Sequence, residues 1–363
     1  MSGPVAAPPS SPAATLLAVD RSWAAALPRP ARPGAFDWWY ADARDARGDG
    51  VVLIWASRLP FFAAERPSIN LVLYRGGRQE FWLLQQPERS ALEERTSAAG
   101  FSVTLDLGDG GSPSVLTVQR AGDEVVLEAS LDLSLPGDVR RLSGTVRVRG
   151  RCALGDGAPL GHHPHRWVPI APVAQLTAEL SLGGAPLFSF DGAGYLDRNL
   201  GDASLAALGL RRWEWGRARA GDRCTAWYLL EGTDGSRQAV RLDAGPEGVR
   251  CSAPPAFSRR GGAIAVDGDA PLLVDPGAAV ERGPFYARSF GTVTGAGLGS
   301  GAADAADAIH ERCEVSRIGA AWHAPLVRMR LHRPGGDNSL WAPLFTGPRR
   351  GRVRRLLGLR SPA

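Results

Sequence analysis

The sequence predicts an all-β protein of antiparallel barrels or sandwiches with few helices, and three observations support this. The 363 residues include 45 Gly and 28 Pro, which implies many turns and therefore short strands. Several segments alternate apolar and polar residues strictly, as at Val103, Leu105 and Leu107, which is typical of a strand with one dry face. The expected strands follow one another without amphipathic helices between them, and this argues against a parallel α/β sheet.

The first half opens with a lead at residues 1–33, rich in Ala, Pro and Ser, which we expect to be mostly disordered, with residues 13–27 as the one candidate for a docking helix. From Phe36 onward the period changes to two, and strands are expected at residues 51–55, 70–74, 80–84, 101–107, 114–120, 124–135 and 141–148. A single helix is expected at residues 87–99, because the segment opens with Pro-Glu-Arg-Ser and closes at Gly100.

The second half repeats this pattern, with strands expected at residues 225–230, 238–243, 248–252, 263–267, 311–318 and 326–331. Each half is long enough for one β unit, and the join is expected in the Pro-rich stretch at residues 161–172. We therefore divide the chain into a disordered lead at 1–33, a first β domain at 34–165, a second at 166–340 that carries the acid motif described below, and a basic tail at 341–363.

The composition excludes several kinds of chemistry and two kinds of location. All 42 basic residues are Arg, so neither a Schiff-base lysine nor the lysine of a phosphate-binding loop exists. The four cysteines are far apart, which favours buried free thiols over a zinc or disulfide-exchange site. The N-terminus lacks the charge and apolar run of a signal peptide, and no apolar stretch is long enough to span a membrane. We therefore expect a cytoplasmic protein.

The basic charge lies at the ends of the chain. Residues 341–363 hold six Arg and no acid, so residues 34–340 carry a net charge of −3 although the whole chain carries +5. The tail is either a solvated basic segment or a patch for anionic lipid, where each Arg contributes roughly 1 kcal/mol. Nucleic acid is a third reading, but no recognition module accompanies it. We expect peripheral membrane contact through the tail, and no nucleic acid.

Five segments could carry chemistry. In the first, at residues 36–40, a strand would place Trp38 and Tyr40 on one face and Trp39 on the other, either as site residues or as packing in the barrel core. The second, at 161–169, holds three of the six histidines, including His162 and His163. Histidine is a common zinc ligand, but no helical pair or carboxylate follows at ligand spacing, so we predict no metal.

The third segment, at residues 194–202, would turn Tyr195, Asp197 and Asn199 to one side of an extended chain, although a turn-forming Asp is the alternative. The fourth, at 212–217, has two Trp on one face, which core packing would also explain. The fifth, at 314–333, contains Trp322, His323 and Arg328, and here a closing pair of strands is the favoured reading.

Together these segments offer a carboxylic acid, a histidine and several aromatic faces, but no activated Ser or Cys. Such a set suits protonation of an unactivated alkene. The reaction needs a buried acid whose pKa is raised by desolvation, so that it stays protonated near neutral pH. It also needs aromatic rings around the developing cation, each contributing up to about 2 kcal/mol when desolvated.

The chain resembles the carotenoid 1,2-hydratases, also called hydroxyneurosporene synthases, in three motifs: His-x-Trp-x-Pro-x-Ala-Pro at residues 165–172, Gly-Tyr-Leu-Asp-x-Asn-x-Gly-Asp at 194–202, and Trp-x-Trp-x-Arg at 213–217. An early Asp-Trp-Trp-Tyr and a late Leu-Val-Arg-Met-Arg are also similar, and the resemblance covers roughly residues 34–335. The chain departs from the family at Gly216, where Ser is more frequent, and at Arg198, a bulky cation beside the acid.

The resemblance implies two tandem lipocalin-like domains with the site near their junction. It also implies addition of water to the terminal C1=C2 double bond of an acyclic carotenoid of the lycopene or neurosporene type, without cofactor or metal. In this reading Asp197 donates the proton, with Tyr195 tuning it and His165 orienting the water as further catalytic residues. The implied substrate-binding residues are Trp167, Asn199, Trp213, Trp215, Trp39 and Tyr40.

Two other functions stay open on the sequence. One is a pericyclase or cyclase of the Diels–Alderase type with the same fold, acting on another polyene, and the other is a non-catalytic carrier of a hydrophobic ligand. The surroundings of Asp197 discriminate between hydration and carriage, because an acid in a dry cleft favours hydration whereas a solvent-exposed turn Asp favours carriage. The expected partners are a hydrophobic polyene, water and a membrane surface.

Overall fold

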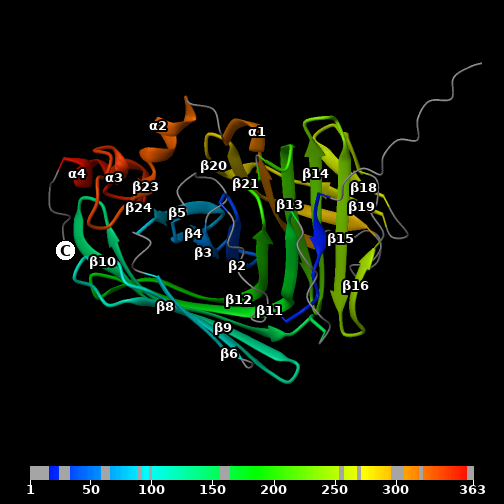
Figure 1. The fold of residues 1–363 in the computed structure, drawn as a ribbon, viewed down its shortest axis with the longest axis horizontal. Coiled ribbons are helices and arrows are strands. Elements are labelled where there is room, and N and C mark those ends of the chain that lie inside the picture. The colour runs from blue at the N-terminus through cyan, green and yellow to red at the C-terminus, as the bar shows by residue number, and fades with distance from the viewer. Residues whose placement is uncertain are drawn as a thin grey trace, which may run out of the picture.

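Two curled antiparallel sheets form the body of the molecule in a computed structural model, and the few helices are short (Figure 1). The structure describes residues 16–23, 33–58, 66–87, 92–97, 100–155, 164–205, 207–252, 257–267, 271–295, 306–318 and 322–357. This architecture confirms the predicted all-β class of tandem lipocalin-like sheets with few helices.

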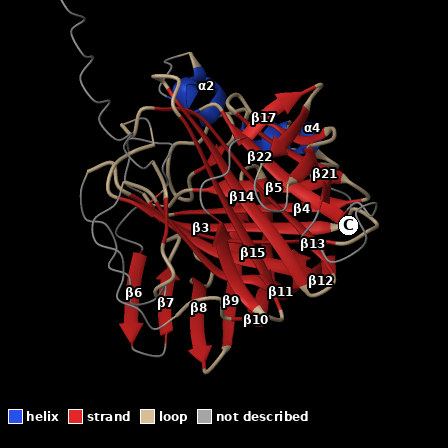
Figure 2. Ribbon diagram, turned by 90° about the vertical axis from the view of Figure 1, so that its right-hand side faces the viewer, coloured by secondary structure: helices blue, strands red, loops and turns tan. Residues whose placement is uncertain are grey.

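The first sheet runs in the order β23-β5-β4-β3-β2-β12-β11-β10-β9-β8-β7-β6, with β1 beside β11 and β24 beside β5. Figure 2 shows β6 to β10 side by side at one margin of this sheet. Its strands are β1 (Ala18–Val19), β2 (Phe36–Arg44), β3 (Gly50–Arg58), β4 (Ser68–Arg75), β5 (Arg78–Gln85), β6 (Leu92–Ser97), β7 (Gly100–Leu105), β8 (Ser114–Ala121), β9 (Glu124–Leu135), β10 (Asp138–Arg151), β11 (Arg166–Leu182), β12 (Ala185–Gly201), β23 (Leu331–His332) and β24 (Gly347–Pro348).

The second sheet runs in the order β16-β15-β14-β13-β22-β21-β19-β18-β17, with β20 beside β21. Its strands are β13 (Leu210–Ala220), β14 (Arg223–Gly232), β15 (Arg237–Gly245), β16 (Gly248–Ser252), β17 (Phe257–Arg260), β18 (Ala263–Val266), β19 (Leu272–Asp275), β20 (Ala279–Arg282), β21 (Tyr286–Gly295) and β22 (Ala306–Cys313). The helices are α1 (Val315–Ile318), α2 (His323–Arg328), α3 (Ala342–Phe345) and α4 (Arg352–Leu356).

A core between the two sheets positions the site. The first sheet encloses its own apolar cluster, and the second sheet has a smaller one. A further cluster joins side chains of β2, β3, β4, β11 and β12 to side chains of β13, β14, β15 and β22. Strand β2 and residues 194–201 of β12 are therefore buried on both faces, because one face packs inside the first sheet and the other packs against the second sheet.

The sheets divide at a different place from the predicted join. Strands β11 and β12, which the sequence placed at the start of a second domain at 166–340, pair with β10 and β2 of the first sheet. The second sheet begins only at Leu210, so the acid motif belongs to the first sheet and faces the second.

Four local predictions were wrong in whole or in part. The expected helix at residues 87–99 contains β6 instead, which pairs with β7 at the edge of the first sheet. Of the strands expected at 311–318 and 326–331, residues 311–313 lie in β22 and Leu331 lies in β23, but residues 315–318 form α1 and residues 326–328 belong to α2. The lead at 1–33 does not contain the expected docking helix in its described part, because β1 pairs in parallel with β11 and Leu17 is buried in the junction core; residues 1–15 and 24–32 lie outside the described residues.

The basic tail is packed against the first sheet over residues 341–357. Strand β24 pairs with β5, and helices α3 and α4 lie beside it (Figure 1). The guanidinium of Arg355 is buried and donates hydrogen bonds to the carbonyls of Thr346 and Pro348 at 2.9 and 2.8 Å. This Arg therefore acts as a structural cap rather than as a solvated charge. Arg349, Arg350 and Arg354 are exposed, and Arg360 lies outside the described residues.

Candidate active site

A buried carboxyl lies where the two sheets meet. Asp197 on β12 is 1% exposed. Its Oδ2 accepts hydrogen bonds from Nε1 of Trp167 at 2.8 Å and from the hydroxyl of Tyr195 at 2.9 Å. Its Oδ1 accepts a third hydrogen bond, from Nδ2 of Asn199 at 3.0 Å. The alternative reading of a solvent-exposed turn Asp is therefore wrong.

The strand alternation of β12 assembles this group. Tyr195, Asp197 and Asn199 project to the junction core, as the two-residue period predicts. Arg198 projects to the other face, where it forms a buried ion pair with Asp37 at 2.9 Å and lies 4.9 Å from the ring of Trp39. The bulky cation beside the acid in sequence is therefore on the opposite side of the sheet.

Asn199 connects the carboxyl to a second layer of side chains. Its Oδ1 accepts hydrogen bonds from the hydroxyl of Tyr228 at 2.8 Å and from Nε2 of His165 at 3.0 Å. Two donors at Oδ1 fix the amide so that Nδ2 faces Asp197. His165 therefore lies one hydrogen bond behind Asn199, and it is not among the side chains that line the cavity described next.

A small cavity of about 50 Å³ lies in front of Asp197. In its wall, the rings of Tyr40 of β2 and Trp215 of β13 contact each other with centroids 4.8 Å apart. The ring centroids of Trp213 and Tyr228 lie 6.2 Å apart. The walls therefore combine two carboxyl groups with aromatic rings from both sheets. The lining residues are Trp38, Tyr40, Ile54, Asp197, Asn199, Trp213, Trp215, Tyr228, Tyr286 and Glu311.

Burial raises the pKa of Asp197 well above its ordinary value, because the dry junction disfavours the carboxylate. The hydrogen bonds from Trp167 and Tyr195 act in the opposite direction, and the negative charges of Asp42 and Glu311 raise the pKa further. Asp42 itself is neutralised by a buried ion pair with Arg217. The site therefore holds an acid that stays protonated at higher pH than an exposed Asp does.

A second carboxylate lies in the cavity wall. Oε1 of Glu311 accepts hydrogen bonds from the hydroxyl of Tyr40 and from Nε of Arg288, both at 2.8 Å. Arg288 is buried, and its Nη1 also donates to Oε2 of Glu281 at 2.6 Å. The guanidinium therefore pairs with both carboxylates, whereas Asp197 is the carboxyl of this cavity without a cationic partner among the described residues.

The second sheet presents its two tryptophans through β13. Trp213 and Trp215 face the cavity, whereas Glu214 points away and pairs with His310 at 3.2 Å. Gly216 follows on the same side as Glu214, and a Cβ there would lie 2.3 Å from the indole of Trp227. Trp227 thus fills the space that a serine side chain would occupy, which explains the departure at this position.

The predicted residues come together with one exception. His165, Trp167, Tyr195, Asp197 and Asn199 form one hydrogen-bonded group, and Tyr40, Trp213 and Trp215 line its cavity. Trp39 must be removed from the site, because it is buried inside the first sheet against Phe101, with ring centroids 5.5 Å apart. Trp38 lines the cavity instead of Trp39, because adjacent residues on a strand project to opposite faces.

Sequence reasoning missed Tyr228 and Glu311 as site residues. Tyr228 follows Trp227 on β14, so strand alternation places the two rings on opposite faces of the strand. No motif in the sequence shows which of these faces meets the first sheet. Glu311 comes from β22, more than 100 residues after Asp197 in the chain, and only the folding of β22 beside β13 brings it into the same cavity.

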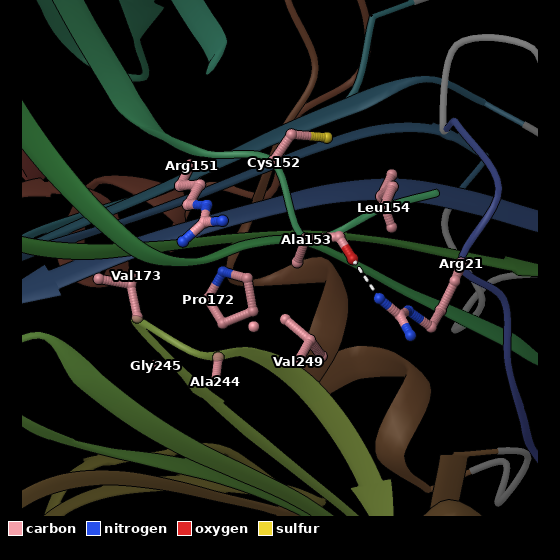
Figure 3. A pocket seen from close by; sticks show the side chains of 11 residues that line it. Arg21, Arg151, Cys152, Ala153, Leu154, Pro172, Val173, Ala244, Gly245 and Val249 are labelled. Atoms are coloured by element: carbon pink, nitrogen blue, oxygen red, sulfur yellow. Dashed lines mark hydrogen bonds between the residues drawn. The ribbon is translucent and has the colours of Figure 1, made fainter. Parts of the chain in front are cut away.

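Another hollow lies between the described part of the lead and β10, β11, β15 and β16 (Figure 3). Arg21 reaches across one side of it and donates a hydrogen bond to the carbonyl of Ala153 at 3.1 Å. None of the predicted site residues lines this hollow. The residues described include no cluster of His, Cys, Asp or Glu suited to a metal ion, and His162 and His163 lie outside them.

Comparison with known proteins decides the family. The profile of the carotenoid hydratase CrtC family matches residues 55–339, which is most of the chain. The chain belongs to this family. It is 28% identical over 289 residues to an acyclic carotenoid 1,2-hydratase of Rubrivivax gelatinosus, covering 72% of this chain and 66% of the relative. It is 26% identical over 338 residues to an acyclic carotenoid 1,2-hydratase of Thiocapsa roseopersicina, covering 84% and 74%.

The fold of this CrtC-family chain is similar to the crystal structure of CghA with Sch210972. The TM-score is 0.54 at 13% identity, with 78% of this chain and 89% of CghA covered. This likeness concerns the fold alone. Within the described residues, no helix has the length and apolar character needed to cross a membrane.

Proposed function

We propose that this chain adds water to the terminal C1=C2 double bond of an acyclic carotenoid of the lycopene or neurosporene type, with Asp197 as the proton donor and without a cofactor. The observation that carries the proposal is the position of Asp197, a desolvated carboxyl held by three hydrogen bonds at the wall of an aromatic cavity. An acid with a raised pKa suits protonation of an alkene, which is a weak base.

The hydrogen bonds indicate which oxygen carries the proton. Oδ2 accepts from both Trp167 and Tyr195, so its lone pairs are occupied and it suits the carbonyl oxygen of the neutral acid. Oδ1 accepts only from Asn199, which leaves one position on this oxygen for a proton directed at the cavity. The proton therefore passes from Oδ1 to C2 of the alkene.

Protonation at C2 leaves a tertiary cation at C1, which the aromatic walls stabilise. Trp38, Trp215 and Tyr228 offer ring faces in the cavity, each worth up to about 2 kcal/mol when desolvated. A water molecule then adds to C1 through its oxygen. The proton that this water releases returns to the Asp197 carboxylate, so the product is a tertiary alcohol and the enzyme is regenerated.

The surroundings of Asp197 favour hydration over carriage of a ligand. A carrier of a hydrophobic ligand needs only apolar walls. Burying a carboxyl costs free energy of folding, and a carrier would gain nothing from that cost. His165 acts through Asn199 in this proposal, since its Nε2 donates to Asn199 rather than contacting the cavity. It is a positioning residue, not the residue that orients the water.

The test is incubation of the protein with lycopene and with neurosporene in H₂¹⁸O, followed by mass analysis of the products. Label in a tertiary hydroxyl group, together with its loss in Asp197→Asn, is the expected result. A cyclised, unhydrated product would instead support the pericyclase reading, and recovery of unchanged polyene that copurifies with the protein would support carriage.

We also propose that the protein collects its substrate at an anionic membrane surface. Exposed apolar side chains lie on and beside α2, α3 and α4, which are grouped at one end of the first sheet (Figure 1). They are Trp322, Leu340, Trp341, Val353 and Leu357, with exposed fractions of 65, 87, 52, 62 and 64%. Exposed arginines of the tail lie among them, and interfacial aromatics beside basic groups fit a lipid headgroup layer.

A further inference from the structure

A second apolar cavity, of about 120 Å³, lies beneath α2. Trp82 and Leu84 of β5 form its floor, Phe285 forms part of one side, and Val327 and Arg330 border it at the helix. The complete lining is Ile54, Asn70, Trp82, Leu84, Glu281, Gly283, Pro284, Phe285, Tyr286, Arg288, Val327 and Arg330.

This outer cavity adjoins the cavity of Asp197. Ile54 of β3 and Tyr286 at the start of β21 line both. The two spaces are therefore separated by the thickness of these two side chains, one from each sheet. A chain that entered beside α2 and passed between Ile54 and Tyr286 would reach Asp197 with its end.

The polar groups around Glu281 in the outer cavity bind one another. Glu281 accepts hydrogen bonds from Nε1 of Trp82 at 3.0 Å and from the hydroxyl of Tyr74 at 2.8 Å, and it pairs with Arg288 at 2.6 Å. Because these groups satisfy one another, they need no polar ligand. The surface that remains is apolar, which suits a hydrocarbon chain and not a polar substrate.

The constriction between the cavities lacks one hydrogen bond. The hydroxyl of Tyr286 is buried and has no hydrogen-bond partner among the residues described, although its ring packs against the junction core and lies 5.4 Å from the guanidinium of Arg288. A buried unsatisfied hydroxyl costs about 1–3 kcal/mol, so turning this side chain aside breaks no hydrogen bond of the hydroxyl and removes this penalty. Both cavities are smaller than the 300–1,000 Å³ of typical ligand pockets, so a long ligand requires such an opening.

We infer that the outer cavity beneath α2 binds the body of the polyene, and that the chain passes between Ile54 and Tyr286 to present its terminal double bond to Asp197. This inference rests on the proposed function for the identity of the ligand. It assigns Leu84 and Val327 to polyene binding, and it assigns Ile54 and Tyr286 to the passage. None of these four residues belongs to the hydrogen-bonded group around the acid.

The test measures binding separately from chemistry, in the full chain carrying Asp197→Asn. Phytofluene, an acyclic carotenoid whose absorption overlaps tryptophan emission, is titrated in detergent, and quenching of the protein fluorescence gives Kd. Leu84→Trp and Val327→Trp each fill the outer cavity, the first from the sheet and the second from the helix. The matched control is Leu273→Trp, which adds the same side chain at an exposed position on β19.

We expect Kd to rise at least tenfold in Leu84→Trp and in Val327→Trp, and to stay within twofold in Leu273→Trp. Thermal unfolding shows whether each variant is folded, and Val327 on the short helix gives a result even if Leu84→Trp unfolds. Unchanged Kd in a folded variant at either position would overturn the inference, as would absence of phytofluene binding. Tight phytofluene binding, together with no tertiary alcohol product from the wild type in the H₂¹⁸O experiment, would contradict the proposed hydration but not the inferred binding site.

Discussion

Nδ2 of Asn199 donates a hydrogen bond of 3.0 Å to Oδ1 of Asp197, two residues before it on the same strand. The contact is possible because residues two apart on a strand project to the same face. Tyr228 and His165 hold the other end of the amide, so the orientation of the carboxyl is fixed from both sheets.

Replacing Asp197 by Asn should abolish hydration, with at least a 10³-fold loss of kcat, because an amide has no proton of suitable acidity to donate. Asn has nearly the same shape and still accepts hydrogen bonds from Trp167 and Tyr195 through its oxygen. We therefore expect unchanged circular dichroism and retained polyene binding. Activity near that of the wild type would rule out Asp197 as the acid.

Replacing His165 by Ala should lower kcat by about 10- to 100-fold with little change in KM, because Asn199 loses one of the two donors that orient it. His165→Gln keeps an N–H donor and should recover part of the rate. A purely structural role predicts loss of stability without this rescue. Kinetics and thermal unfolding of both variants separate the two outcomes.

The rate should fall as the pH rises, because the protonated form of Asp197 is the active one. Its pKa is raised well above the ordinary value by burial, so kcat should stay constant through mildly acidic pH and decrease only above that raised pKa. The pH profile of kcat tests this directly. A rate that increases with pH over this range would indicate a carboxylate acting as a base.

The raised pKa of Asp197 should also appear in the pH dependence of the free energy of unfolding. Below about pH 4 Asp197 is protonated in both the folded and the unfolded chain. As the pH rises, the unfolded chain loses a proton that the folded protein retains, so the free energy of unfolding decreases until the raised pKa is passed. Asp197→Asn lacks this penalty, and its stability relative to the wild type should increase with pH in urea titrations. A constant difference would contradict the raised pKa.

Trp38 and Trp39 should respond in opposite ways to the same substitution. Trp38→Leu removes a ring from the cavity wall and should lower kcat by tenfold or more, with a smaller loss of stability than Trp39→Leu because Trp38 borders a cavity. Trp39→Leu empties space in the core of the first sheet and should cost roughly 2–4 kcal/mol of unfolding free energy. Steady-state kinetics and urea unfolding of the pair measure both effects. Equal kinetic losses would contradict the assigned faces.

The membrane proposal predicts binding to vesicles that contain phosphatidylserine. Trp322→Ser with Trp341→Ser should reduce sedimentation with such vesicles at least tenfold, and added salt should weaken the wild type because the arginine contribution is screened. Leu273→Ser, an exposed apolar residue on the second sheet, is the control and should bind like the wild type. Equal binding to neutral and anionic vesicles would contradict the role of the arginines.

Local alternation predicted much of the site. The period of two in residues 194–202 placed Tyr195, Asp197 and Asn199 on one face without knowledge of any partner strand. The same period separated Trp38 from Trp39, but it did not show which face meets the second sheet. Both faces of β2 are buried, so burial could not decide between them, and the prediction that Trp39 is a substrate-binding residue is wrong.

The sequence by itself predicted the all-β class, the resemblance to the family and the grouping of Tyr195, Asp197 and Asn199 on one face, because these depend on periodicity and on motifs within one or two strands. Only the tertiary structure decided where the sheets divide, that Tyr228 and Glu311 line the cavity of Asp197, and that a second, mostly apolar cavity shares Ile54 and Tyr286 with it. These features arise from contacts between strands far apart in the chain. Their pairing depends on the packing of two whole sheets, and no local pattern records it.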